Sequence, residues 1–232
     1  MLKINPFRWV RNRKEKKWIR ENSNKWIQGK WLHIHVKNNN TVQVGWVDIE
    51  QNYQNIRARG RNYDAKEMSL TTGSIEDWER TEWQYVDAQI NYDPSFTRLY
   101  LLGLYYTVKI KHGNDKEYNY GMHRLIIEPG GEMKEPVAMY GSFGDVYTLE
   151  HEIGRSCPSC GHIQMYRISK AMERELYKEN GSFDPKILSS LISGEIKLED
   201  EICKRYVSNV KTALDHTEMR NMNQQNREKD ND

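Results

Sequence analysis

The sequence contains little cysteine and no long apolar run. Only three of its 232 residues are cysteine, which is too few for a disulfide framework and is typical of a reducing compartment. No stretch approaches the roughly eighteen uninterrupted apolar residues of a membrane-spanning helix. The basic N-terminus also lacks the apolar core of a signal peptide. We therefore expect a cytoplasmic protein.

A catalytic motif is also missing. The chain has no glycine-rich phosphate loop, no nucleophile elbow and no His-Glu-x-x-His helix. Its seven histidines are scattered without motif spacing. His33 and His35 alternate with Ile34 on one expected strand, and we interpret both as surface residues rather than ligands. The sequence thus predicts a protein that is not an enzyme.

The charge is distributed unevenly along the chain. The net charge is +2, yet residues 1–30 hold ten lysines or arginines against Glu15 and Glu21. The remaining residues therefore carry about −6. This balance gives little support to broad nucleic-acid binding by the main domain.

Short alternating aromatic and aliphatic segments dominate the region between residues 31 and 169, with turn residues in most of the connections. The eight segments are 31–36, 42–50, 54–61, 81–91, 98–111, 120–128, 137–146 and 161–169. Eight strands joined by short turns are typical of an up-and-down antiparallel barrel. We predict an eight-stranded, lipocalin-like barrel over residues 30–169. Such a barrel either fills with its own side chains or holds one small ligand.

The spacing within the segments shows two further patterns. In segment 98–111 the larger apolar residues share one face: Tyr100, Leu102, Leu104, Tyr106, Val108 and Ile110.

Five glycines lie inside or at the end of the segments: Gly45, Gly60, Gly103, Gly121 and Gly141. Strand glycines mark bends or the close approach of a ligand or another backbone. We favour bends.

Helical patterns flank the barrel. Residues 1–29 form a basic segment, and residues 7–28 within it predict an amphipathic helix. This helix closes one end of the barrel, or it docks on an anionic membrane or a partner. The third alternative is a flexible arm. Residues 170–215 predict a helical hairpin with an every-fourth stripe of Ile202, Tyr206, Val210 and Leu214. This stripe must pack on the barrel or on a second subunit, so a homo-oligomer is one expectation. The polar residues 216–232 predict a disordered tail.

Three arginines at alternate positions, Arg57, Arg59 and Arg61, must point the same way. They form either an outward row neutralised by acids such as Glu50, Glu82 or Asp87, or a phosphate cradle at the inner wall or rim. Further candidate ligand-binding residues are Tyr85, Tyr105, Tyr106, His123, Arg124 and Tyr140. Rings with a few cations suit a nucleotide. The alternatives are an apolar ligand such as a fatty acid, or an adaptor that binds nucleic acid or protein through the basic helix.

The segment Cys157-Pro158-Ser159-Cys160-Gly161 has the form of a zinc knuckle. A closed zinc site needs four ligands. Cys157 and Cys160 would supply two of them, and His151, His162, Cys203 or a second subunit would supply the others. A redox pair and an ordinary hairpin turn with two free thiols are the other interpretations.

The order of these features resembles the barrel of the SMODS-associating two-transmembrane β-strand-rich effectors of bacterial CBASS antiphage systems. The resemblance covers residues 28–169 and rests on Gly29-Lys30-Trp31, on residues 44–51 and 56–60, on Trp83-Gln84-Tyr85, on residues 101–106 and on residues 139–143. It implies a barrel that binds a cyclic di- or oligonucleotide made during phage infection and then oligomerises. The two membrane helices of the family are replaced here by the basic segment, so membrane disruption does not carry over.

Overall fold

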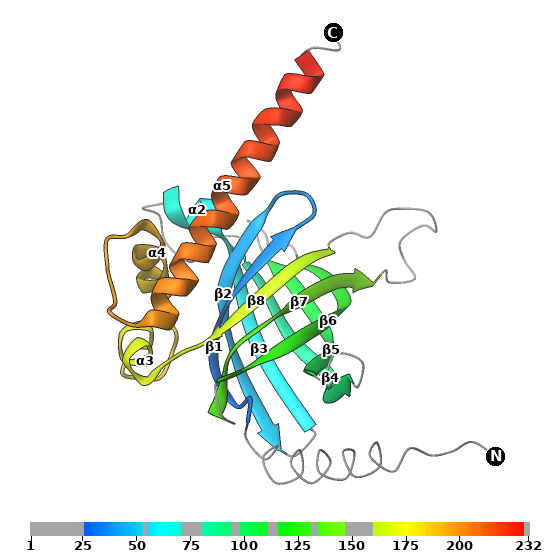
Figure 1. The fold of residues 1–232 in the computed structure, drawn as a ribbon, viewed down its shortest axis with the longest axis vertical. Coiled ribbons are helices and arrows are strands. Elements are labelled where there is room, and N and C mark those ends of the chain that lie inside the picture. Colours follow the sequence, from blue (N-terminus) through cyan, green and yellow to red (C-terminus); the bar gives the residue numbers. More distant parts are fainter. Residues whose placement is uncertain are drawn as a thin grey trace, which may run out of the picture.

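The computed structural model describes residues 26–52, 55–70, 80–93, 98–110, 116–130, 134–146 and 160–229. Eight antiparallel strands follow one another around a closed barrel, and the last strand pairs with the first (Figure 1). They are β1 (Gly29–Lys37), β2 (Val42–Asn52), β3 (Asn55–Asp64), β4 (Arg80–Asp93), β5 (Arg98–Ile110), β6 (Lys116–Gly130), β7 (Lys134–Val146) and β8 (Cys160–Arg167). This confirms the predicted antiparallel eight-stranded barrel, segment by segment.

Alternation along each strand separates an inner from an outer row of side chains. In β5, Leu101 and Tyr105 are buried inside the barrel, whereas Leu102 and Leu104 are exposed on the outside. The apolar row predicted for this segment is therefore the outer one. The inner row includes Gly103, and the space above it is filled by the Tyr85 ring from β4.

One end of the barrel is filled by apolar side chains. The fully buried residues here include Trp31, Leu101, Leu125, Met139 and Met165. Trp26 and Ile27 close this end, and the Ile27 N–H donates to Gln51 Oε1 at 2.9 Å. Arg167 donates to the carbonyl oxygens of Trp26 and Gln28. The basic helix predicted within residues 1–29 lies almost entirely outside the described residues.

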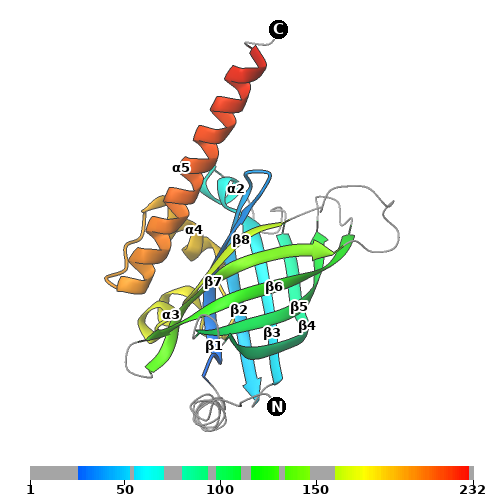
Figure 2. The same ribbon diagram turned by 45° about the vertical axis from the view of Figure 1, so that its right-hand side comes forward.

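Helices cover the outer side of β1, β2 and β8 (Figures 1 and 2). They are α2 (Ala65–Leu70), α3 (Lys170–Leu176), α4 (Pro185–Ser193) and α5 (Glu201–Lys229). Leu32 and Val44 of the barrel are buried in the same cluster as Leu188, Tyr206 and Val210 of the helices. This confirms that the α5 stripe packs on the barrel. Because β1 is covered on both sides, five consecutive residues from Trp31 are buried.

The helical region differs from the prediction in two respects. The sequence analysis missed α2, whereas α3 precedes the two helices of the hairpin, as the helical pattern of residues 170–178 predicts. α4 begins at Asp184, whose side chain accepts from the Lys186 N–H, and ends at Gly194 with φ 88°. α5 continues to Lys229 through the residues predicted to be disordered. Methionine, glutamine, arginine and glutamate are good helix formers, so this polar segment extends the helix without an apolar stripe.

At 29 residues α5 is about 43 Å long, and its C-terminal half extends past the barrel (Figure 1). None of the helices in the described part of the chain combines the length and apolar character needed to cross a membrane.

The strand glycines mark close approach rather than simple bends. A Cβ on Gly45 would lie 1.8 Å from the Arg61 carbonyl oxygen and 2.9 Å from His33 Nε2. At Gly144 the nearest atom would be Cys160 Cβ, at an ordinary 3.8 Å. The backbone of β3 therefore leaves no room for a side chain at position 45.

We expect Gly45→Ala to lower the free energy of unfolding by about 1–3 kcal/mol, the usual range for overpacking. Gly144→Ala is the matched control, and its change should stay within about 0.5 kcal/mol. Urea unfolding monitored by tryptophan fluorescence measures both. Equal effects of the two substitutions would contradict the close contact.

A candidate ligand-binding cup

The barrel is hollow at the end opposite Trp26. A cavity of about 210 Å³ opens where β1 ends and β2 begins. Its walls combine polar and ring-bearing side chains from β1 to β7: His35, Lys37, Gln43, Asn62, Thr81, Trp83, Tyr105, Thr107, Lys109, Asn119, His123, Phe143 and Asp145. We call this cavity the cup. The barrel therefore has two halves. The half near Trp26 is filled by apolar side chains, and the opposite half contains a cavity with polar walls.

Glycines place the rings of the cup. Trp83 lies against Gly60 of the neighbouring strand, Tyr85 against Gly103, and Tyr105 against Gly121. In each case a Cβ on the glycine would come within about 2.4 Å of the ring. A ring lying over a strand glycine covers its exposed backbone. The glycines therefore allow large rings to lie flat on the inner wall and leave the centre open.

Asn62 organises the polar groups at the base of the cup. Trp83 Nε1–H donates to Asn62 Oδ1 at 2.8 Å, which fixes the orientation of the amide because an indole nitrogen can only donate. His33 Nε2 must then donate to the same oxygen at 2.7 Å, and Asn62 Nδ2 donates to His35 Nδ1 at 3.0 Å. His33 Nε2 and His35 Nε2 therefore carry the ring protons.

Two of these histidine nitrogens have no hydrogen-bond partner among the described residues. They are His33 Nδ1, an acceptor, and His35 Nε2, a donor, and both are buried. His35 is 5 % exposed and lines the cup. A buried donor without a hydrogen bond lowers the free energy of unfolding, and such groups are rare in native proteins. Because Nε2 is itself buried, a ligand acceptor or a bound water in the cup would satisfy it after a shift of the surrounding rings.

His33, His35 and Phe143 form a ring stack, and His123 packs edge-on against His35. The His35 ring lies 4.9 Å from that of His33 and 4.9 Å from that of Phe143, nearly parallel to both. His123 packs at 4.3 Å from the Tyr105 ring and pairs through Nδ1 with the Tyr85 hydroxyl at 3.0 Å. The result is a closely packed set of neutral aromatic surfaces at the floor of the cup.

Burial keeps these histidines neutral. Desolvation lowers the pKa of His33 and of His123 to about 3. Desolvation, followed by the charges of His33 and His123, lowers the pKa of His35 well below its usual value. Burial also raises the pKa of Tyr85, so its hydroxyl stays protonated. At neutral pH the floor of the cup carries no charge.

The charged groups lie nearer the mouth. Lys37 and Lys109 line the opening, and Asp145 accepts a hydrogen bond from the Tyr105 hydroxyl at 2.7 Å. An anionic group of a ligand would meet the two lysines there while a planar ring enters between the aromatic walls. This combination of a few polar groups with ring surfaces is common in small-molecule sites.

The structure brings together only part of the predicted ligand-binding set. Tyr85, Tyr105 and His123 are in the cup region. The outer face holds Arg57, Arg59, Arg61, Tyr106, Arg124 and Tyr140. Arg61 pairs there with Glu82 at 2.7 Å.

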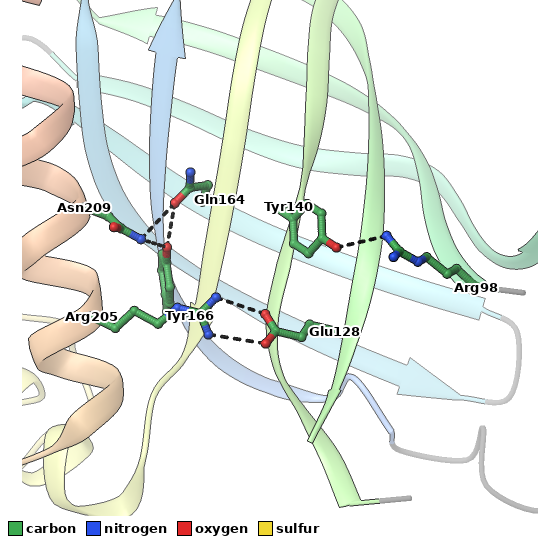
Figure 3. Close-up of polar contacts among 7 residues, drawn as sticks. All are labelled: Arg98, Glu128, Tyr140, Gln164, Tyr166, Arg205 and Asn209. Carbon is green, nitrogen blue, oxygen red and sulfur yellow. Dashed lines mark hydrogen bonds and ion pairs between the residues drawn. The ribbon is translucent and has the colours of Figure 1, made fainter. Parts of the chain in front are cut away.

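Tyr140 lies on the outside of β7, where its hydroxyl accepts from Arg98 at 3.3 Å (Figure 3). Beside it, Arg205 of α5 pairs with Glu128 of β6 at 3.1 Å, and Asn209 contacts Gln164 and Tyr166. These contacts attach α5 to the barrel and place no polar group inside the cup.

The interpretation of His33 and His35 as surface residues is wrong. Both are buried, at 0 % and 5 % exposure. The sequence analysis also missed Asn62, Trp83 and Phe143 as cup residues. One signal was available: residues 31–36 contain no charged side chain, which indicates a strand buried on both faces.

The zinc prediction is not tested, because Cys157 and His151 lie outside the described residues. Cys160 accepts from Asn38 Nδ2 at 2.9 Å at the start of β8. Cys203 is buried in the helical layer, where desolvation raises the pKa of its thiol to about 11. Within the described ranges no group of three or more His, Cys, Asp or Glu side chains could hold a metal ion.

Comparison with known proteins gives no relative: the chain matches no protein-family model and no curated protein.

Proposed function

We propose that this chain is a non-enzymatic, lipocalin-like sensor that binds a small anionic ligand in the cup. The observation that carries the proposal is the cavity of about 210 Å³, which has rings on its walls, Lys37 and Lys109 at its mouth, and in its wall His35 Nε2, which has no hydrogen-bond partner among the described residues. The ligand supplies an acceptor to His35, a planar ring to the aromatic walls, and an anionic group to Lys37 and Lys109.

The cup selects for a ring compound of limited size. Its volume is below the roughly 300–1,000 Å³ of sites for drug-sized ligands. A nucleobase fits these requirements because it has a planar face and hydrogen-bonding edges. The resemblance to the antiphage effectors favours a cyclic di- or oligonucleotide. We propose that such a ligand inserts one base and leaves its phosphates at the mouth.

A thermal-shift panel tests the proposed ligand class. Cyclic mono-, di- and trinucleotides, linear mononucleotides and fatty acids are each added to the full chain. A ligand present at one hundred times its Kd should stabilise the fold by about 2.7 kcal/mol. We expect stabilisation by at least one nucleotide and none by the fatty acids, because the apolar half of the barrel is filled by Trp31, Leu125 and Met139. Stabilisation by a fatty acid alone would reverse this assignment.

A further inference from the structure

A second surface of the barrel has the character of a binding site. We propose that the outer face of β3–β6 binds single-stranded nucleic acid, with bases on its tyrosine rings and phosphates on its arginines. The site is separate from the cup and does not depend on the function proposed for it. In the described part of the chain this side of the barrel has no helix over it (Figure 2).

Exposed rings and apolar side chains run across two neighbouring strands. Tyr118 is 50 % exposed and Tyr120 44 %. Tyr106 faces Tyr120 across the β5–β6 pair, and its ring lies 5.3 Å from that of Tyr120 and 5.9 Å from that of Tyr118. Ring faces of this kind stack on nucleobases with little preference for sequence. Three adjacent rings would hold successive bases.

Cations outnumber the acids on this face. Its arginines are Arg57, Arg59, Arg61, Arg80, Arg98 and Arg124, and the carboxylates among the described side chains of the same strands are Asp64, Glu82, Asp87 and Glu128. The Asp64 carboxylate accepts from the backbone N–H groups at the start of α2. Glu82 pairs with Arg61 and Arg80, and Glu128 pairs with Arg205.

Arg57 and Arg59 are exposed and have no ion-pair partner among the described residues. Glu50 and Asp48 of β2 lie opposite Arg57 and Arg59 in the β2–β3 pair, but no ion pair joins them among the described residues. The two guanidinium groups are therefore complementary to an anionic partner. The charge of about −6 outside residues 1–30 conceals this local surplus, because the sequence does not show which cations share a face.

A groove joins the rings to the arginines. It has a volume of about 280 Å³ and is lined by Trp46, Arg59, Arg61, Tyr106 and Val108, among others. Guanidinium groups bind phosphate with two hydrogen bonds and also stack on bases. In a neighbouring row, the Arg124 guanidinium already lies over the Tyr100 ring, 5.3 Å from its centre. The groove can hold a base against Trp46 or Tyr106 with its phosphate at Arg59.

Fluorescence anisotropy with labelled oligo-dT and oligo-U of about 12 nucleotides, a length within known barrel site sizes, tests the proposal. Residues 1–30 carry ten basic residues and can attract nucleic acid themselves. The uncharged test is therefore Tyr118→Ser/Tyr120→Ser, which should weaken binding by about 5- to 150-fold for each stacked base lost. Both side chains are exposed, so the fold should persist.

Arg57→Ser/Arg59→Ser tests the phosphate contacts. Removing two of them should lower the magnitude of the slope of log affinity against log salt by about 1.4. Arg174→Ser/Lys186→Ser removes the same charge from exposed positions on α3 and α4 and is the control. It should leave the slope and the affinity nearly unchanged.

Three results would overturn the proposal. The first is that the protein binds no oligonucleotide. The second is a result in which Tyr118→Ser/Tyr120→Ser leaves binding intact while the arginine variant and its control weaken binding to the same extent. The third is a dimer in sedimentation velocity that the tyrosine pair dissociates, in a protein that binds no oligonucleotide. That result would assign the face to a second copy of the chain.

Discussion

Lowering the pH from 7 to 5 should destabilise this protein by at least about 4 kcal/mol, close to 2 kcal/mol for each of His33 and His123, and the depressed pKa of His35 adds to the loss. In the folded chain their pKa values are depressed, to about 3 for His33 and His123. In the unfolded chain they take up protons near pH 6.5. The unfolded state therefore binds more protons below pH 6.5, and stability falls as the pH falls from 6.5 toward 3.

Urea unfolding at pH 7, 6 and 5 measures this dependence. His33→Gln removes one of the three titrating groups and should reduce the loss between pH 7 and pH 5 by about 2 kcal/mol. His216→Gln changes an exposed histidine on α5 and should leave the loss unchanged. A free energy of unfolding that stays constant between pH 7 and pH 5 would mean that the three rings are not buried and neutral.

Replacing Asn62 by leucine should lower the free energy of unfolding by at least about 3 kcal/mol. Asn62 is the hydrogen-bond partner of Trp83 Nε1, His33 Nε2 and His35 Nδ1, and it is 3 % exposed. Leucine has a similar size but leaves all three groups buried without a partner, at roughly 1–3 kcal/mol each. This is the largest loss that we expect from a single substitution in the cup.

Asn119→Leu is the control, because Asn119 lines the same cup and its side chain has no hydrogen bond among the described residues. We expect it to change the free energy of unfolding by less than about 0.5 kcal/mol. Denaturant unfolding at pH 7 compares the two. A similar loss for both variants would show that Asn62 does not organise the histidines.

The sequence predicted the barrel well because each strand has turn residues near its ends and rings or β-branched residues along its length. It did not predict the direction in which the arginines point. Alternate spacing places Arg57, Arg59 and Arg61 on one side of a strand but does not say which side is inside. The row with the larger apolar residues in β5 is the outer one, because Gly103 on the inner row makes room for Tyr85.

The cup could be predicted only in part for a similar reason. Tyr85, Tyr105 and His123 have inward positions, and their ring and hydrogen-bonding chemistry predicts them as ligand-binding residues. His35 and Asn62 come together only through the pairing of β1 with β2 and of β2 with β3, which places them on one wall. The His33 side chain is buried inside the barrel against Asn62 of β3 and the His35 ring, so its burial depends on the same strand pairing. The uncharged run 31–36 indicates a strand buried on both faces but does not specify which residues cover it.

The most direct test of the account is to locate the bound ligand with two matched pairs of variants. Calorimetric titration uses the nucleotide that stabilises the protein best in the thermal-shift panel. Lys37→Ser/Lys109→Ser removes two cations from the mouth of the cup, and Arg57→Ser/Arg59→Ser removes two from the outer face. We predict at least about tenfold weaker binding for the lysine pair, since a hydrogen bond to a charged group contributes about 1.5–3 kcal/mol, and an unchanged Kd for the arginine pair. Loss of binding in the arginine pair with full binding in the lysine pair would contradict a ligand site inside the barrel.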